Sequence, residues 1–336
     1  MTRGKTDVAN GQPSPPGRLG LWNSWLRWRT SSPPALSTRW WFSLGAAPLQ
    51  LLAVQLVTGL LLALHYRASA AEAYDSTQLI TEQLSYGWFV RGLHRWSATL
   101  MIATALLHQL RVLLTGAYRA PRQWTWVTGW SCLLAFVAAS FTGEFLTGQQ
   151  RGVWSVLLGA NLVAEVPGIG PFLRRVLLGG DGLMEGSTPR LFAAHGILLP
   201  AAMVALMAAH LWLVQHLGST GGEGDTPTAV PERVAFGPDQ LRLDLLVGLA
   251  LVLTATVLAT ADPGTLGPAA SIHGSVDAIR PHWYALPAVR WVRLVPAWAA
   301  ASSLCLGVAL VALWPWLEPR VFDGPLGRSL GVAGRG

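Results

Sequence analysis

Apolar residues in this chain are gathered into long runs that contain few charges, and polar, Gly-rich or Pro-rich stretches separate these runs. A membrane-spanning helix needs about 20 mostly apolar residues, because it rises about 1.5 Å per residue through a hydrocarbon core of about 30 Å. Six runs have that length, so the pattern predicts an all-α integral membrane protein with six transmembrane helices. The six expected spans are approximately residues 41–66, 88–114, 125–146, 190–216, 241–260 and 294–316.

The segments between the runs suggest how the chain is divided. The connection at 147–187 is too long to lack structure in a compact membrane domain, and we expect short surface helices near 151–162 and 171–178. Residues 218–238 are rich in Gly, Pro and acidic side chains, which is typical of a boundary between two modules. The expected units are a cytoplasmic N-terminal extension at 1–39, a four-helix domain at 40–218, a linker at 219–240 and a domain with two further transmembrane helices at 241–336.

Composition supports a membrane protein and excludes several other classes. Only 12% of the residues are charged and 51% are hydrophobic, whereas soluble domains carry about 25% charged residues. The net charge of +7 comes mainly from arginines that flank the apolar runs, which argues against nucleic acid as a partner. Cys132 and Cys305 both lie in apolar runs and form no CxxC or CxxCH motif, which excludes an iron–sulfur cluster, a structural zinc site and an ordinary c-type haem on this chain.

The placement of basic residues predicts the orientation. Residues 1–39 and the loop after the second span fall on one side of the membrane, and both are rich in arginine with little acid. The positive-inside rule makes this side the cytoplasm, so we expect a cytoplasmic N-terminus. The long loop at 147–190 also carries four arginines, so the rule is only partly obeyed.

Two of the predicted spans carry histidines at nearly equal spacing. His94 and His108 are 14 residues apart, and His195 and His210 are 15 residues apart. A helix rises about 1.5 Å per residue, so the two histidines of each helix are about 21–22 Å apart along its axis. At about 100° per residue, 14 steps fall about 40° short of whole turns and 15 overshoot by about 60°, so both histidines lie roughly on one face of the helix. Two such helices side by side place the imidazoles in two facing pairs at two depths.

Facing imidazoles suit the axial ligation of haem iron, so the pattern favours two b-type haems held non-covalently by histidine pairs. A single histidine in an apolar helix is more often a hydrogen-bonded core residue. Four of them in a doubled pattern favour function, since ionisable residues inside a membrane are costly.

Glycines in the other two expected helices repeat the same spacing. Gly45 and Gly59 are 14 residues apart in the first span, and Gly129 and Gly143 are 14 apart in the third. Without a side chain, glycine lets a flat macrocycle approach the helix backbone. The alternative is ordinary packing of helices through small residues. Together with the histidines, the glycines favour a four-helix di-haem bundle.

Three arginines, Arg91, Arg95 and Arg111, flank the histidines of the second span. Haem propionates are carboxylates, which guanidinium groups bind through paired hydrogen bonds. The alternative is that these arginines reach out of the membrane or set the topology.

With these residues in view, the chain resembles cytochrome b of the cytochrome bc complexes, and the b6-type in particular. The resemblance is strongest in YRASAAEAYDSTQLITEQLSYGWFVRGLHRWSAT at 66–99 and in the 14 and 15 residue spacing, and covers about residues 40–218. A weaker resemblance to the partner subunit IV follows at about 236–316. There, Pro281, His282, Trp283 and Tyr284 are similar to the PEWY quinol-site motif of the family.

The resemblance implies specific roles. His94 with His195 would hold the outer haem, and His108 with His210 would hold the haem on the cytoplasmic side, with the four glycines packing against the haems. The implied reaction is quinol oxidation at the outer face. One electron would pass to a Rieske iron–sulfur protein and on to a c-type cytochrome, and the other would pass inward to a quinone. The expected setting is a homodimer within a larger complex in a bacterial cytoplasmic membrane.

Four departures from the family pattern bear on the site. His282 stands where the motif has a proton-accepting glutamate, although a histidine also takes a proton near neutral pH. Residues 146–149 (LTGQ) replace a PW-containing segment that forms the wall of the quinol pocket. Ser43 aligns with the cysteine that binds an additional haem covalently in the b6-type, so no such haem is expected. The last helix of subunit IV has no counterpart.

Three functions remain as candidates. The favoured one is the di-haem subunit of a proton-translocating quinol–cytochrome c reductase, active only within its complex. The alternative is a di-haem, quinone-reactive membrane anchor without a Rieske partner, since the quinol-site motif is altered. A membrane protein without haem is disfavoured by the presence of all four histidines and all four glycines.

Overall fold

The computed structural model describes residues 39–217, 240–271 and 281–322. Within these ranges the regular structure is helical, apart from an isolated bridge between Gln149 and Ala269. The predicted all-α fold is therefore confirmed. The predicted N-terminal extension at 1–39 and the linker at 219–240 lie almost wholly outside the described residues.

Most of the predicted spans are helices long and apolar enough to cross a membrane. Five described segments meet this condition; the first predicted span is instead the shorter α3, of 17 residues. Pro48 lies in its first turn, where the missing N–H of proline costs no helical hydrogen bond, and a turn at 44–46 separates it from α2 (Arg39–Ser43). The bounds are Ala47–Ala63 for α3, Gly87–Leu114 for α5, Gln123–Leu146 for α6, Leu241–Ala261 for α11 and Ala297–Phe322 for α13. Ser187–Ala193 (α9), Ala194–Leu198 (η3) and Leu199–Leu217 (α10) form one continuous segment.

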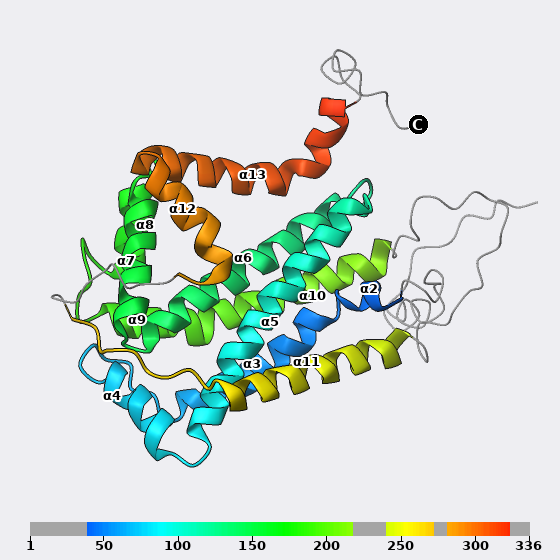
Figure 1. Ribbon diagram of the computed structural model, residues 1–336. Helices are drawn as coiled ribbons and strands as arrows, with labels where there is room; N and C mark the ends of the chain where they lie inside the picture. The colour runs from blue at the N-terminus through cyan, green and yellow to red at the C-terminus, as the bar shows by residue number, and fades with distance from the viewer. Residues whose placement is uncertain (1–38, 218–239, 272–280, 323–336) are drawn as a thin grey trace, which may run out of the picture.

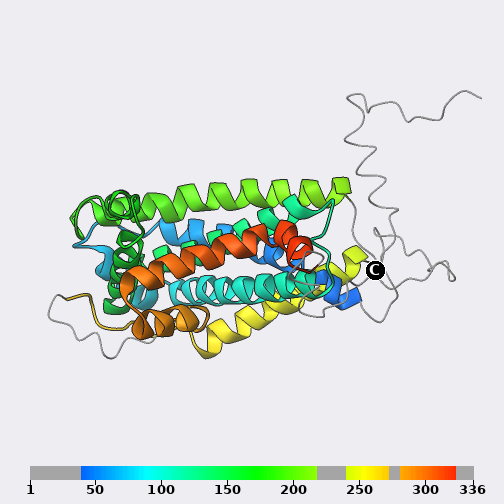
Figure 2. The ribbon, with the colours of Figure 1, turned by 90° about the horizontal axis from the view of Figure 1, so that it is seen from above.

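The four helices that carry the predicted histidines and glycines form a bundle. α3 packs against α5, α6 packs against α10, and α11 covers α5 and α3. Figures 1 and 2 show these helices running side by side along the length of the molecule. The apolar centre of the bundle takes residues from all four of its helices, including Leu51, Met101, Phe136 and Met203.

Short helices gather at one end of this bundle. α7 (Gln150–Ala164) and α8 (Gly170–Leu178) lie where the sequence predicts surface helices. They pack on each other and on the end of α6 through a second apolar cluster. α4 (Ala73–Gln78) and η2 (Leu79–Gln83) lie at the same end (Figure 1).

The C-terminal part is attached to the bundle at both ends. After α11 the chain runs beside the start of α7, where the amide of Gln150 donates to the carbonyl of Pro268 at 3.0 Å. η5 (Trp283–Ala285) and α12 (Leu286–Leu294) lead into α13, which packs against α6 and α7. At the opposite end, Arg119 binds Glu318 of α13 at 2.7 Å. These contacts hold the segment 281–285 against the end of α6.

Candidate functional site

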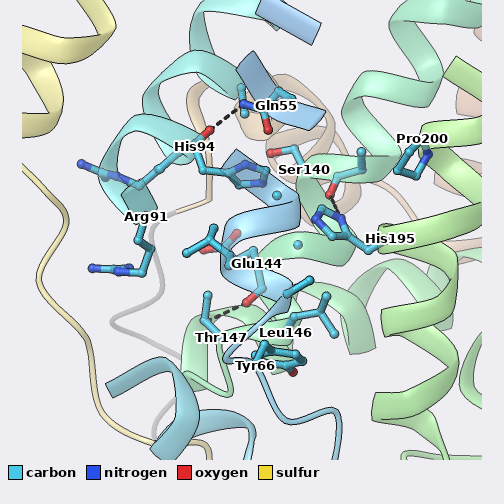
Figure 3. Close-up of a pocket in the computed structure, with 18 of the residues that line it drawn as sticks. Gln55, Tyr66, Arg91, His94, Ser140, Glu144, Leu146, Thr147, His195 and Pro200 are labelled. Atoms are coloured by element: carbon cyan, nitrogen blue, oxygen red, sulfur yellow. Dashed lines mark hydrogen bonds between the residues drawn. The ribbon is translucent and has the colours of Figure 1, made fainter. Parts of the chain in front are cut away.

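The structure brings the four predicted histidines together in two facing pairs inside the bundle. His94 on α5 faces His195 on η3 with ring centroids 6.2 Å apart, and Figure 3 shows the two side chains pointing toward one another. His108 on α5 faces His210 on α10 at 6.4 Å. All four histidines are half-buried between the helices of the bundle.

A π-helical turn gives His195 and His210 the same relative orientation along their helix as His94 and His108 have along α5. η3 (Ala194–Leu198) begins immediately before His195, inside the continuous helix 187–217. A π turn takes up one residue more than an α turn. The 15 residues between His195 and His210 therefore rotate like about 14 α-helical residues, and the expected overshoot of about 60° becomes a shortfall of about 40°, equal to that of His94 and His108. His195 can then face His94, and His210 can face His108, at two depths of the bundle.

The distance within each pair fits a bound metal ion. With metal–nitrogen bonds of about 2 Å on each side, and each ring centroid about 1 Å behind its nitrogen, two imidazoles on one ion have centroids roughly 6 Å apart. The observed 6.2 and 6.4 Å agree with this value. Direct packing of two imidazoles does not require this separation, so the spacing supports a site for iron between the rings.

The hydrogen bonds of the imidazoles leave Nε2 free to act as a ligand. Nδ1 of His195 lies 3.0 Å from the carbonyl of Ala139, and Nδ1 of His210 lies 3.0 Å from that of Thr125. A carbonyl only accepts, so Nδ1 carries the hydrogen and Nε2 keeps its lone pair. For His94, Nδ1 lies 2.8 Å from the Thr58 hydroxyl.

The Thr58 hydroxyl also lies 2.7 Å from the carbonyl of Val54, to which it donates. It therefore accepts from Nδ1 of His94, and Nε2 of His94 is free as well. His108 Nδ1 has no hydrogen-bond partner in the described part of the chain.

Each predicted glycine lies against one of the histidines. A Cβ atom at any of these positions would come within 3.3 Å of an imidazole carbon, closer than ordinary packing allows. In the structure the glycines thus make room for the imidazole rings themselves. The added Cβ would lie 3.0 Å from Cε1 of His108 at Gly45, 3.3 Å from that of His94 at Gly59, 3.0 Å from that of His210 at Gly129 and 2.6 Å from that of His195 at Gly143.

Gly143→Ala is expected to weaken haem binding at the outer pair, because its methyl group would overlap the ring of His195. Overpacking of this kind costs about 1–3 kcal/mol, which corresponds to a loss of haem affinity of roughly 5- to 150-fold. Haem titration followed by absorption measures the effect. Gly159→Ala is the matched control, because a Cβ at Gly159 meets nothing within 4 Å. Equal haem affinity in the two variants would contradict the role assigned to Gly143.

The predicted propionate-binding arginines have protein partners in the structure. Arg95 binds the carboxylate of Asp262 at 2.7 Å, and Arg91 donates to the carbonyls of Pro263 and Gly264. Arg91 and Arg95 still line the cavity beside the outer histidine pair. Arg111, near the inner pair, is buried with its guanidinium 3.8 Å from the centre of the Phe42 ring. A role of the three arginines in propionate binding stays a prediction.

A single cavity joins the outer histidine pair to the predicted quinol-site motif. Its volume is about 630 Å³, and it is lined by His94 and His195, by Gly59 and Gly143, and by His282. Figure 3 shows the labelled part of this cavity, with Ser140 and Glu144 of α6 near the two histidines. A substrate beside His282 would lie in the same cavity as the pair of His94 and His195.

The motif residues differ in their exposure to this cavity. The rings of His282 and Tyr284 are stacked, with centroids 5.2 Å apart and planes 7° from parallel. The Tyr284 hydroxyl lies 2.5 Å from Ser140 Oγ, and burial raises the pKa of Tyr284 to about 12, so the phenol stays protonated. Trp283 is exposed and contacts Tyr284 edge-on, and Pro281 is half-buried before it. The polar side-chain atoms of the two stacked rings, those of His282 and Tyr284, are therefore the ones that the motif can offer for chemistry.

A carboxylate beside His282 was not found by the sequence analysis. Nε2 of His282 lies 2.5 Å from Oε2 of Glu144, and the other carboxylate oxygen forms a salt bridge with Arg151 on α7. One feature of the sequence could have identified this carboxylate. Glu144 is the sole acidic residue in helix α6, and an acid inside a membrane helix is a functional candidate.

Ser43, which the resemblance to the b6-type aligns with the cysteine that binds an additional haem, is the last residue of α2. It is fully buried and accepts a hydrogen bond from Gln240 at 3.1 Å. Thioether attachment requires a cysteine sulfur, and Cys132 and Cys305 lie elsewhere in the chain. A denaturing gel stained for haem is expected to show no band at the mass of this chain, and a stained band would contradict the non-covalent assignment.

Comparison with known proteins gives matches over the same part of the chain. The family model described as cytochrome b/b6/petB matches residues 29–218. Cytochrome b6 of Synechococcus sp. (strain RCC307) is 34% identical over 180 residues, which cover 54% of this chain and 83% of that protein. Cytochrome b6 of Gloeobacter violaceus is 36% identical over 182 residues, covering 54% of this chain and 84% of that protein.

A solved structure is similar over most of the chain, including the C-terminal helices. The structure titled hyperthermophilic respiratory Complex III matches with a TM-score of 0.75, covering 89% of this chain and 80% of that chain. At 21% sequence identity this similarity concerns the fold.

Proposed function

Because this chain belongs to the cytochrome b/b6 family, we propose that it is the di-haem subunit of a quinol–cytochrome c reductase and oxidises quinol at its outer face. The observation that carries this proposal is the cavity that the outer histidine pair shares with His282. In this arrangement a quinol bound beside His282 and Tyr284 would lie close to the first electron acceptor inside the bundle.

The histidine pairs would hold the two haems. His94 and His195 would ligate the outer one, and His108 and His210 the inner one, each through Nε2. When bound, the haems supply one-electron redox centres at two depths of the bundle. The glycines opposite the rings fix the imidazole positions, and Thr58 and the backbone carbonyls fix the orientation of three of the rings.

Among the motif residues, His282 accepts a proton from quinol. Its imidazole lines the cavity, and its stacking on Tyr284 limits rotation of the ring. Tyr284 stays protonated and is tied to Ser140, so it binds and orients and does not take the proton. Trp283 packs edge-on against Tyr284, and Pro281 precedes His282 in the chain.

The proposed complex includes a Rieske iron–sulfur protein and a c-type cytochrome, forms a homodimer, and lies in a bacterial cytoplasmic membrane with the N-terminus of this chain in the cytoplasm. We divide the chain as the composition indicates, into a haem domain at 40–218 and a quinol-site domain at 241–336. The packing of α13 on α6 and α7 supports a close association of these two parts.

A second function, a di-haem quinone-reactive anchor without a Rieske partner, is favoured by one observation. His282 replaces the motif glutamate, and residues 146–149 replace the usual pocket wall. Purification in mild detergent separates the two functions. The proposed function requires two b-type haems per chain, a copurifying iron–sulfur protein and quinol-dependent reduction of a c-type cytochrome. Two haems with a different redox partner would favour the second function, and a haem-free protein would contradict both.

A further inference from the structure

We infer that Glu144 is the positioning residue that receives the quinol proton through His282. This inference rests on the proposed function and deepens it, since it assigns a second member to the proton-accepting group. Glu144 lies on α6 and His282 lies 138 positions further along the chain. The pair exists because the segment before α12 folds back on the end of α6.

The geometry gives each ring nitrogen of His282 a different role. Nε2 lies 2.5 Å from the Glu144 carboxylate, which only accepts, so Nε2 carries the hydrogen and donates it. Nδ1 then holds the lone pair, and it has no hydrogen-bond partner among the residues that the structure describes. The stacked ring of Tyr284 holds the imidazole in this orientation. Nδ1 is thereby kept as an acceptor for a substrate hydroxyl in the cavity.

Glu144 is less exposed than either of its two partners, since the side chain of His282 is 25% exposed and that of Arg151 is 44% exposed. The Glu144 side chain is 7% exposed and bonded to His282 on one oxygen, while Arg151 on its other oxygen is 44% exposed. A buried carboxylate is costly without a counter-charge and hydrogen bonds, and Arg151 and His282 provide both. Glu144 therefore lies between the imidazole of His282 and an arginine that water reaches.

The proton transfer balances with the proposed reaction. Oxidation of one quinol releases two electrons and two protons. The iron–sulfur partner and the haem that His94 and His195 would hold would each supply a one-electron acceptor, so the residues of this chain have to handle the protons. One proton goes from a quinol hydroxyl to Nδ1 of His282, while the proton on Nε2 passes to Oε2 of Glu144. Glu144 then gives it to water beside Arg151. The imidazole, left with its hydrogen on Nδ1, returns to its first tautomer by giving that proton to water and taking one up from water on Nε2. The second proton is released to water at the same end.

Other ionisable groups face this pair and contribute to its pH response. Arg151 of α7 and Tyr284 of η5 contact it, and Tyr66, Arg91 and Arg95 line the same cavity. The two histidines of the outer pair line the cavity as well. A change at Glu144 leaves all of these groups in place, so it reports on the carboxylate alone.

Glu144→Gln tests the inference in the purified complex. The amide oxygen can still accept from Nε2 of His282, which preserves the contact, but it takes up no proton and carries no charge. Quinol-dependent reduction of a c-type cytochrome is expected to fall at least 10-fold with both haems retained. The residual activity is expected to persist to lower pH than in the wild type, because the imidazolium loses its anionic neighbour. Glu144→Asp keeps the charge and is expected to recover part of the rate.

Glu318→Gln is the matched control. Glu318 is also a poorly exposed acid bound to an arginine, Arg119, but it lies on α13, and Arg119 precedes the start of α6. Wild-type rate and pH profile in Glu144→Gln would overturn the inference, as would loss of haem in both Glu144→Gln and Glu144→Asp, which would indicate a role in folding. A wild-type complex that does not oxidise quinol would instead overturn the proposed function.

Discussion

Replacing His282 with Gln is expected to reduce quinol oxidation by about 100- to 10,000-fold, the usual contribution of a positioned proton acceptor. The glutamine side chain can form hydrogen bonds in the same loop, but it cannot take a proton. Both haem sites are expected to stay filled, because His282 is not among the four paired histidines. Turnover with quinol and a c-type cytochrome, measured beside haem content, checks both parts of this result.

The pH profile gives a further readout of the same residue. A protonated imidazole cannot accept, so wild-type turnover is expected to fall as the pH is lowered. In His282→Gln this acid limb is expected to disappear from the residual activity. An unchanged rate and profile in His282→Gln would mean that His282 only packs in its loop.

His216→Gln is the matched control for this experiment. His216 stacks on Trp212 with ring centroids 5.2 Å apart, as His282 stacks on Tyr284, but His216 does not line the cavity. Turnover in His216→Gln is expected to equal that of the wild type.

The motif glutamate is not a simple substitute at position 282. His282→Glu would place a second carboxylate against Glu144, and two carboxylates in contact tend to share one proton. This variant is therefore expected to be slower than the wild type, although the motif of the family has glutamate there. Combining His282→Glu with Glu144→Gln removes the repulsion and is expected to raise the rate above that of His282→Glu alone.

His94→Leu is expected to lower the haem content from two to one per chain and to abolish quinol oxidation. The leucine fills the space of the imidazole but provides no ligand, so His195 is left without its opposite partner. The inner pair, His108 and His210, lies at the other depth of the bundle and is expected to keep its haem. A reduced-minus-oxidised absorption spectrum with a haem assay measures the loss.

The reciprocal variant tests the pairing itself. His108→Leu is expected to remove the inner haem and to leave the outer signal. Loss of the same spectral component in His94→Leu and His108→Leu, or two haems retained in either variant, would contradict the pairing. His216→Leu is the control, because His216 belongs to neither pair.

Local sequence pattern was sufficient for most of the helical architecture. The spans at 88–114 and 125–146 agree with α5 and α6, and the surface helices expected near 151–162 and 171–178 are α7 and α8. The first span is shorter than predicted, because a turn at 44–46 interrupts an apolar run that hydropathy alone reads as continuous. The length of an apolar run, and the glycines and prolines that interrupt it, affect only neighbouring residues. These features can therefore be recognised in the sequence.

The histidine pairs illustrate the limit of that kind of reading. Their spacing predicted two facing pairs. In ideal α-helices, however, the angle between His195 and His210 would differ by about 100° from the angle between His94 and His108. The π turn at Ala194–Leu198 removes this difference. Packing of the helix against α6 and α3 decides where such a turn forms, and no local pattern in the sequence specified it.

By itself, then, the sequence determined the helices, the four histidines and the glycines that match their spacing. Only the tertiary structure decided that each glycine abuts one imidazole, that Arg91 and Arg95 bind the loop after α11, and that Glu144 meets His282. The physical reason is distance along the chain. Helix formation and membrane insertion depend on residues within about 20 positions of one another. The contact of Glu144 with His282 depends instead on the packing of the segment before α12 onto the end of α6.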